Sequence, residues 1–183
     1  MKILLFAGSL RRDSLNKKFA REAARLLSSR PGIQVEFVDL QPLAIPVYDG
    51  DVEAASGVPA GVQTLSRMIA AADALVVSTP EYNGSIPGVL KNTIDWLSRL
   101  KPLSLAGKPF LLLAASPGAL GGTRSLWHTR QPFEVLGVHV FPEMMGLPLA
   151  HEAFDASGAL KDAKTSERLS GLLERFVAHS RRK

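Results

Sequence analysis

The sequence predicts an α/β protein built around a doubly wound parallel sheet. Short apolar runs alternate with segments of helical periodicity along the 183 residues, as in sheets covered by helices on both faces. The run "DALVVSTP" (73–80) is apolar without interruption until its last residues, which is typical of a central strand buried on both faces. The length suits one domain, so we expect a single domain over residues 1–183.

Five strands are expected from the apolar runs. They are "KILLFA" (2–7), "IQVEFVDL" (33–40), "DALVVSTP" (73–80), "KPFLLLAAS" (108–116) and "VHVFP" (138–142). The second run alternates apolar Ile33, Val35 and Phe37 with Gln34 and Glu36. That alternation favours an edge strand with one wetter face.

Helices are expected between these strands. The first begins near Ser14 or Leu15 and ends before Pro31-Gly32, the second carries Val62 to Ala72, and the third starts at Pro87. The fourth lies in "GGTRSLWHTRQPFEVLG", where Pro132 is expected to kink or shorten it. The last runs from about 161 to 179. Residues 42–61 are expected to form a loop, and residues 142–160 an irregular segment.

The composition is that of a soluble globular protein, with 46% hydrophobic and 21% charged residues. No apolar run approaches the roughly 20 residues that cross a membrane, and the N-terminus is not expected to be a secretory signal. The chain has no cysteine, which excludes disulfides and thiolate metal sites. A cytoplasmic location is the default expectation.

The net charge of +5 is distributed unevenly. Residues 1–30 hold eight Lys and Arg against two acids, whereas residues 31–160 hold seven against twelve. A basic segment can bind nucleic acid, but these residues mostly fall on one expected helix without aromatic residues between them. A solvated helix face is the favoured interpretation. Part of the charge can instead serve an anionic small ligand beside Gly8.

Ligands of doubly wound sheets bind at the carboxyl ends of the strands, near the switch in strand order. The loops after the first, third and fourth strands, residues 8–16, 80–86 and 116–122, are therefore taken together. The first, "GSLRRDSLN", combines a glycine turn with the electropositive start of a helix. Ser9, Ser14, Asn16 and Arg11 or Arg12 could all donate to a phosphate there. The alternative is that Ser14 or Asp13 only caps the helix.

The other two loops suit a flat ligand. "STPEYNGSIPG" follows the most buried strand yet carries Tyr82, which could stand against a polar ring whose edge is held by backbone amides. The alternative is an ordinary strand–helix connection. "ASPGALGGTRS" contains three glycines that allow the main chain to approach a ligand closely, although a flexible surface loop is also possible. Together the loops predict a site for a phosphorylated ring compound.

Three segments, "GSLRRDSLN", "PEYNGSIPGVLKNTIDWLSR" and "SPGALGGTRS", closely resemble the NADPH-dependent FMN reductase family, a flavodoxin-like group that includes chromate, quinone and azo-dye reductases. The later segment "FDASGALKDAKTSERL" is also similar to that family. The resemblance implies a five-stranded parallel sheet of order 2-1-3-4-5 with helices on both faces. It also implies noncovalently bound FMN, with NAD(P)H as co-substrate.

The resemblance also implies a role for each loop. Ser9, Arg11, Ser14 and Asn16, with the backbone near Leu15, would hold the FMN phosphate. Pro80, Glu81, Tyr82, Asn83 and Gly84 would line the isoalloxazine, and Ser116 and Gly118 would flank it. FMN carries the redox chemistry itself, so no catalytic acid, base or nucleophile is expected. The four histidines lie outside the loops, and no metal site is expected.

The implied activity is the transfer of electrons from NAD(P)H through FMN to a small acceptor such as a quinone, an azo compound, a metal oxyanion or a flavin. The alternative is a flavodoxin-type electron carrier without NAD(P)H activity. The basic charge disfavours it, because such carriers are usually acidic. Neither a nucleic-acid partner nor a membrane partner is expected. A homodimer or homotetramer is expected, partly from the resemblance and partly from Trp96 near the second loop.

Overall fold

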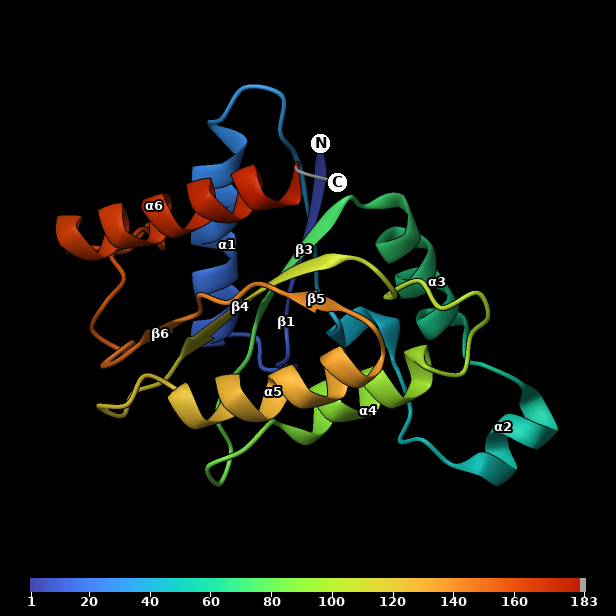
Figure 1. Cartoon of the computed structure of the whole chain (residues 1–183). Coiled ribbons are helices and arrows are strands. Elements are labelled where there is room, and N and C mark those ends of the chain that lie inside the picture. Colours follow the sequence, from blue (N-terminus) through green and yellow to red (C-terminus); the bar gives the residue numbers. More distant parts are fainter. Residues whose placement is uncertain (182–183) are drawn as a thin grey trace.

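A computed structural model describes residues 1–181, and a parallel sheet forms its centre (Figure 1). Five strands follow the order β2-β1-β3-β4-β5, and a sixth, β6, pairs with β4 beyond the end of β5. The strands are β1 (Lys2–Ala7), β2 (Gln34–Val38), β3 (Ala74–Ser78), β4 (Pro109–Ala115), β5 (His139–Val140) and β6 (Met145–Leu147). The expected order of the five strands is confirmed, with β2 as the predicted edge strand.

Helices cover both faces of the sheet, as the alternating pattern predicts. They are α1 (Leu15–Ser28), α2 (Gly50–Ser56), α3 (Ala60–Ala71), α4 (Gly88–Leu97), α5 (Thr123–Val135) and α6 (Ala163–Ser180), with a 3-10 turn η1 (Gln41–Leu43). Figure 1 shows α6 lying across α1 on one side of the sheet, with α4 and α5 side by side on the other. No helix within residues 1–181 is long and apolar enough to cross a membrane.

Two apolar layers hold these helices to the sheet, because successive side chains of a strand point to opposite faces. Ile3 and Leu5 pack with Phe19 of α1 and Phe176 of α6, whereas Leu4 packs with the residues of α3, α4 and α5. The central strands β3 and β4 are buried along their whole length. The sheet is therefore a rigid platform for the loops at its carboxyl edge.

The segment 142–160 is more ordered than expected, since it contains β6. Ser116 N–H donates to Leu147 O, and β6 pairs with the last residues of β4, in the register Leu113–Met145 to Ala115–Leu147. A three-residue strand with a central glycine has too weak an alternating pattern to be recognised in the sequence. Its pairing with β4 fixes the base of the loop that follows β4.

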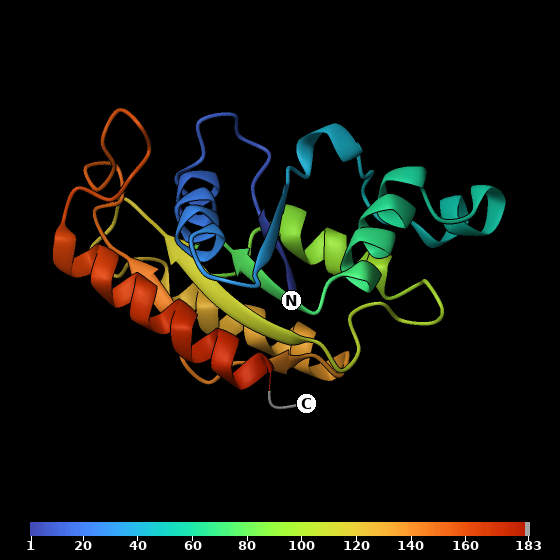
Figure 2. The same cartoon turned by 90° about the horizontal axis from the view of Figure 1, so that it is seen from above.

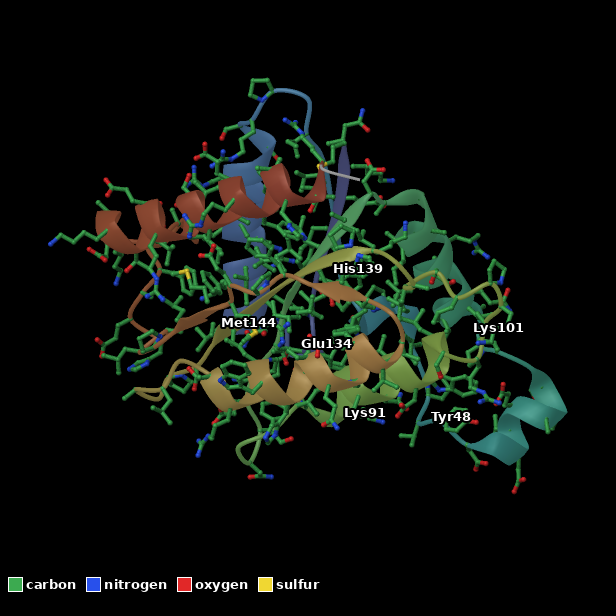
Figure 3. The ribbon with its side chains drawn as sticks, viewed as in Figure 1. Tyr48, Lys91, Lys101, Glu134, His139 and Met144 are labelled. Atoms are coloured by element: carbon green, nitrogen blue, oxygen red, sulfur yellow. The ribbon has the colours of Figure 1, made fainter. Side chains whose placement is uncertain are left out.

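The expected loop at 42–61 also contains helical structure, η1 and α2. In Figures 1 and 2, α2 lies at the periphery of the molecule, beyond α3. Tyr48 (Figure 3) connects the segment 42–61 to α4. Its N–H donates to Asn92 Oδ1 over 2.8 Å, and its ring stands edge-on to Trp96. The Tyr48 hydroxyl donates to Glu53, which also accepts from Arg99.

Three further expectations change. The helix α5 continues through Pro132 to Val135, so proline does not end it at the preceding residue. Trp96 is completely buried, and its indole N–H donates to Pro46 O. Trp96 therefore belongs to the core and provides no surface for association between copies. Pro87 is the N-cap of α4, which therefore begins at Gly88, one residue later than expected.

A partly buried ion pair joins α1 to the residue that follows β2. The side chain of Lys17 is only 3% exposed, and its ammonium donates to Asp39 Oδ2 over 2.7 Å. Burial acts to raise the pKa of Asp39, but the hydrogen bonds from Lys17 and from Gln41 N–H hold this pKa below its usual value. The pair stabilises the fold only while Asp39 is ionised.

We expect Asp39→Asn to lower the free energy of unfolding by about 2 kcal/mol at pH 7, because the hydrogen bond then lacks one charge and Lys17 stays buried. Since the folded-state pKa of Asp39 is lowered, its contribution is complete above the unfolded pKa of about 3.9 and disappears as the pH falls through the folded pKa. Urea unfolding from pH 7 to pH 3 should therefore show the two proteins converging.

Glu167→Gln, an exposed change on α6, is the matched control and should shift stability by less than about 0.5 kcal/mol at every pH. A constant gap between wild type and Asp39→Asn down to pH 3 would contradict this role of the ion pair.

Candidate functional site

A small hollow opens at the carboxyl edge of the sheet, where the three loops after β1, β3 and β4 meet. Its lining contains nine of the twelve site residues expected from the sequence: Ser9, Arg11, Ser14, Leu15, Asn16, Pro80, Glu81, Tyr82 and Ser116. Ala115 and Pro117 complete it. Three expected residues, Asn83, Gly84 and Gly118, are outside this lining.

The N-terminus of α1 forms one wall of the hollow. Ser14 caps it in extended conformation, with its side chain accepting from Lys17 N–H and its carbonyl accepting from Lys18 N–H. The N–H groups of Leu15 and Asn16 therefore have no acceptor within residues 1–181, and the first turn contains no acid. Such an end attracts an anion. Ser14 thus caps the helix and lines the hollow at the same time.

The Asn16 side chain has a different role from the expected one. Its Nδ2 donates to Ala115 O over 2.8 Å, and its Oδ1 accepts from Ala115 N–H and from the Ser78 hydroxyl. The residue is 2% exposed. Both polar atoms of this amide are thus engaged within the protein, so the side chain braces α1 against β3 and β4. The backbone N–H of Asn16 has no such partner and is left to hold a ligand.

The register of the sheet explains why this brace is needed. Ser78 of β3 pairs with Leu113 of β4, and two further residues would place Pro80 opposite Ala115. Proline has no N–H for a strand ladder, and here the chain turns away into the second loop. The Asn16 amide takes the vacated position beside Ala115. A buried peptide group that would otherwise be unpaired is thereby satisfied.

The second loop is a short β-hairpin. Tyr82 and Ser85 exchange two backbone hydrogen bonds of 3.1 and 3.0 Å. Between them, Asn83 and Gly84 have φ angles of 51° and 74°, as in the two-residue hairpin turn that Asn-Gly favours. The turn leaves Tyr82 half-exposed at the mouth of the hollow. Asn83 and Gly84 therefore shape the loop.

Glu81 joins this hairpin to α5. The N-cap of this helix is Gly122, which has no side chain to cap it. The Glu81 carboxylate accepts instead from the N–H groups of Arg124 and Ser125. The Arg124 guanidinium also donates to it. Burial acts to raise the pKa of Glu81, but the bonds from Arg124 and Ser125 hold it below its usual value. Glu81 is therefore ionised at neutral pH and caps α5 from another loop.

The glycines of the third loop serve packing within the chain. A Cβ on Gly122 would lie 2.8 Å from Ala114 Cβ, and one on Gly121 would lie 2.9 Å from Pro148 N. Both have positive φ angles. Gly118 has a more open environment, and its N–H donates to Ser116 Oγ. The close approach expected toward a ligand is thus, at Gly121, an approach to neighbouring backbone and, at Gly122, an approach to the Ala114 side chain.

Sequence reasoning missed the residues that support the loops from behind. Arg124 and Ser125 stand in the quoted third segment, but their bonds to Glu81 span more than forty residues. His128, expected to lie outside the loops, has its Nδ1 2.9 Å from Ser85 Oγ. The separation of four residues between Arg124 and His128 could have indicated that both support the second loop, because it places them on one face of α5.

The hollow has the size of a phosphate site. Its volume is about 80 Å³, whereas a drug-sized ligand occupies roughly 300–1,000 Å³. Larger hollows lie elsewhere, one of 410 Å³ between α4 and α5 and one of 290 Å³ between β6 and α6. Hydroxyls, two free N–H groups and Arg11 face the small one. Over residues 1–181, no three His, Asp or Glu side chains are grouped to bind a metal.

Comparison with known proteins identifies relatives along the whole chain. A family model described as NADPH-dependent FMN reductase matches residues 1–152. A quinone reductase of Escherichia coli is 40% identical over 179 residues, covering 96% of this chain and 93% of that protein. An NAD(P)H-dependent FMN reductase of Pseudomonas aeruginosa is 42% identical over 184 residues, covering 100% and 96%.

A solved structure is similar over almost the same range. It is the flavoenzyme NAD(P)H:acceptor oxidoreductase FerB from Paracoccus denitrificans, with a TM-score of 0.82 and 32% identity. The match covers 98% of this chain and 97% of that one. The sheet and the loops at its carboxyl edge therefore lie within the shared region.

We expect Asn16→Leu to lower the free energy of unfolding of the flavin-free protein by about 3–5 kcal/mol, because the Ser78 hydroxyl and the Ala115 peptide lose their buried partners. Urea unfolding measures this loss. Tyr82→Ala, at the exposed mouth of the same hollow, is the control and should cost less than about 1 kcal/mol. If Asn16→Leu is as stable as Tyr82→Ala, the amide does not brace the loops.

Proposed function

The chain belongs to the NADPH-dependent FMN reductase family, and from this premise we propose that its three loops bind FMN for the transfer of electrons from NAD(P)H to a quinone. The activity class follows from the family and from relatives named as quinone reductases. The observation that supports these loops as the site is the acid-free N-terminus of α1, which meets the Tyr82 hairpin and Ser116 in one hollow.

The residues around this hollow fit the phosphate of FMN. The free N–H groups of Leu15 and Asn16 would donate to it, together with the hydroxyls of Ser9 and Ser14. Arg11 would add a charge-assisted hydrogen bond from the exposed side. Ser9 is almost fully buried, so its hydroxyl can be held in place before the ligand arrives. The Asn16 side chain would keep these groups aligned with β3 and β4.

The hollow is too small for a three-ring system, so the isoalloxazine would lie outside it along the Tyr82 hairpin and Ser116. Bound FMN supplies the redox chemistry, accepting two electrons from NAD(P)H and passing them to the acceptor. The protein supplies binding and orientation. The half-exposed Tyr82 would offer an aromatic face to a flat ring. The bonds from Glu81 to the start of α5 would hold the hairpin against that helix.

An exposed ring explains how two substrates can use one site in turn. The nicotinamide of NAD(P)H and a quinone are both flat, and both would need access to the flavin ring. A mouth bordered by Tyr82 and the third loop, instead of a closed cavity, leaves that access open. The quinones named for the relatives belong to this class of acceptor. We propose a small quinone as the substrate.

An electron carrier of the flavodoxin type is the second candidate, and it would also bind FMN. It is disfavoured by the charge, since a net charge of +5 does not suit basic protein partners. The family assignment points the same way. The two candidates differ in whether NAD(P)H alone reduces the bound flavin.

We further propose that copies of the chain associate as a homodimer or homotetramer, and that the protein is cytoplasmic. Trp127 and Val135 on α5 support the first proposal, because both are large apolar residues that are mostly exposed. A chain without cysteine suits a reducing compartment. Light scattering at micromolar concentration and cell fractionation measure these two properties.

The purified protein should be yellow, release FMN on denaturation, and oxidise NADPH or NADH continuously when a benzoquinone is present. Steady-state absorbance at the nicotinamide band measures this activity. If the protein binds FMN but its flavin is not reduced by either nicotinamide, it is a carrier and the proposed reductase activity is wrong.

Arg11→Ala should weaken FMN binding about tenfold to a hundredfold, because a charge-assisted bond to a partly exposed phosphate contributes about 1.5–3 kcal/mol. Riboflavin, which lacks the phosphate, should lose little. Titration of both ligands into flavin-free protein, followed by quenching of flavin fluorescence, measures the two losses.

Arg12→Ala is the matched control for this titration. Its side chain is 95% exposed and lies 3.8 Å from Asp13, its nearest carboxylate, so its removal should change FMN binding far less. Equal losses of FMN and riboflavin in Arg11→Ala would mean that Arg11 maintains the shape of the loop. A larger loss in Arg12→Ala would assign the phosphate contact to that arginine.

A further inference from the structure

We propose that His128 is a positioning residue for the flavin ring. It would act by holding Ser85, the C-terminal residue of the Tyr82–Ser85 hairpin. The proposal rests on the proposed function, because it assumes that this hairpin borders the ring. It assigns a role to a histidine on α5 that lies outside the three loops.

The hairpin needs support from outside. It consists of a single pair of residues, Tyr82 and Ser85, joined by two backbone hydrogen bonds around a two-residue turn. Even a complete two-stranded hairpin is only marginally stable in water. The position of the half-exposed Tyr82 therefore depends on whatever holds the two ends of the turn.

The helix α5 holds both ends. Glu81, just before the hairpin, is bound by Arg124 and Ser125 at the start of α5. Ser85, at its end, is bound one helical turn further on, where His128 Nδ1 lies 2.9 Å from Ser85 Oγ. Arg124 and His128 are four residues apart and share one face of the helix. Gly84 of the turn lies beside the first of these residues, with its Cβ position 3.7 Å from the Arg124 guanidinium.

The two contacts differ in strength. At Glu81, a buried carboxylate accepts several hydrogen bonds, including those from the charged Arg124 guanidinium, and these bonds fix the loop to the helix. The His128 contact is a single hydrogen bond. His128 also lines the hollow between α4 and α5, together with Lys91 of α4, which is labelled in Figure 3. Losing this hydrogen bond would leave the hairpin attached at Glu81 and, through Ile86, at the core, but with its Ser85 end held less firmly. We therefore expect a change in ring binding and little change in stability.

His128→Ala should weaken the binding of FMN and of riboflavin equally, by about three- to tenfold. One hydrogen bond is lost, whereas the groups proposed to hold the phosphate are unchanged. This differs from Arg11→Ala, which should act on FMN alone. In the flavin-free protein, the amide hydrogens of Tyr82 and Ser85 should exchange faster, since their two mutual bonds would open more often. Fluorescence titration and hydrogen exchange measure these effects.

Three further variants test the assignment. His128→Asn places an amide atom near the position of Nδ1 and should restore binding, whereas His128→Gln places its amide further out and should not. Ser85→Ala should reproduce His128→Ala, and the double variant should lose no more than either single one. Gln131→Ala, which lines the same hollow one turn along α5, is the control and should bind as wild type does.

The proposal is overturned if His128→Ala binds riboflavin as wild type does with unchanged exchange at Tyr82 and Ser85, or if it loses FMN alone. It is also overturned if His128→Asn binds no better than His128→Ala. A wild-type protein that binds no flavin would instead contradict the proposed function. The two failures are therefore distinguishable in one set of titrations.

Discussion

The buried amide of Asn16 is the contact on which the site depends. It joins the first turn of α1 to the last residues of β3 and β4, and a loop of the site adjoins each of these three elements. Because the side chain is committed to Ala115 and Ser78, the start of α1 cannot shift without breaking buried hydrogen bonds. The free N–H groups of Leu15 and Asn16 are held at a fixed position relative to the other two loops.

The same principle applies at the second loop, where Glu81 occupies a position that the family pattern associates with the ring. Its carboxylate replaces the missing cap of α5, where the packing against Ala114 leaves room only for Gly122. In the proposed site, side chains that would form no ligand contact of their own thus decide where the groups proposed to face the ligand stand. Those groups are backbone N–H groups, hydroxyls, one arginine and one tyrosine, none of which needs an unusual protonation state.

Much of this could be predicted from the sequence, and the limits have physical reasons. Periodicity and apolar runs predicted the five strands and the main helices, because each is a local pattern. The order of the strands in the sheet was implied by the family resemblance. The strand β6 and the helix α2 were missed, since a three-residue strand and a seven-residue helix carry little pattern of their own. The nine residues that meet in the hollow were predicted together because parallel strands end at one edge. The inward roles of Asn16 and Glu81 were not, because their partners are 99 and 43 residues away.

A crystal structure of the protein with FMN tests the central claim most directly. The account predicts the phosphate within hydrogen-bonding distance of the N–H groups of Leu15 and Asn16 and of the Ser9 or Ser14 hydroxyl. It also predicts that the Asn16 side chain is still bonded to Ala115 and Ser78. A phosphate bound away from the start of α1, or an Asn16 side chain turned from Ala115 toward the phosphate, would contradict it.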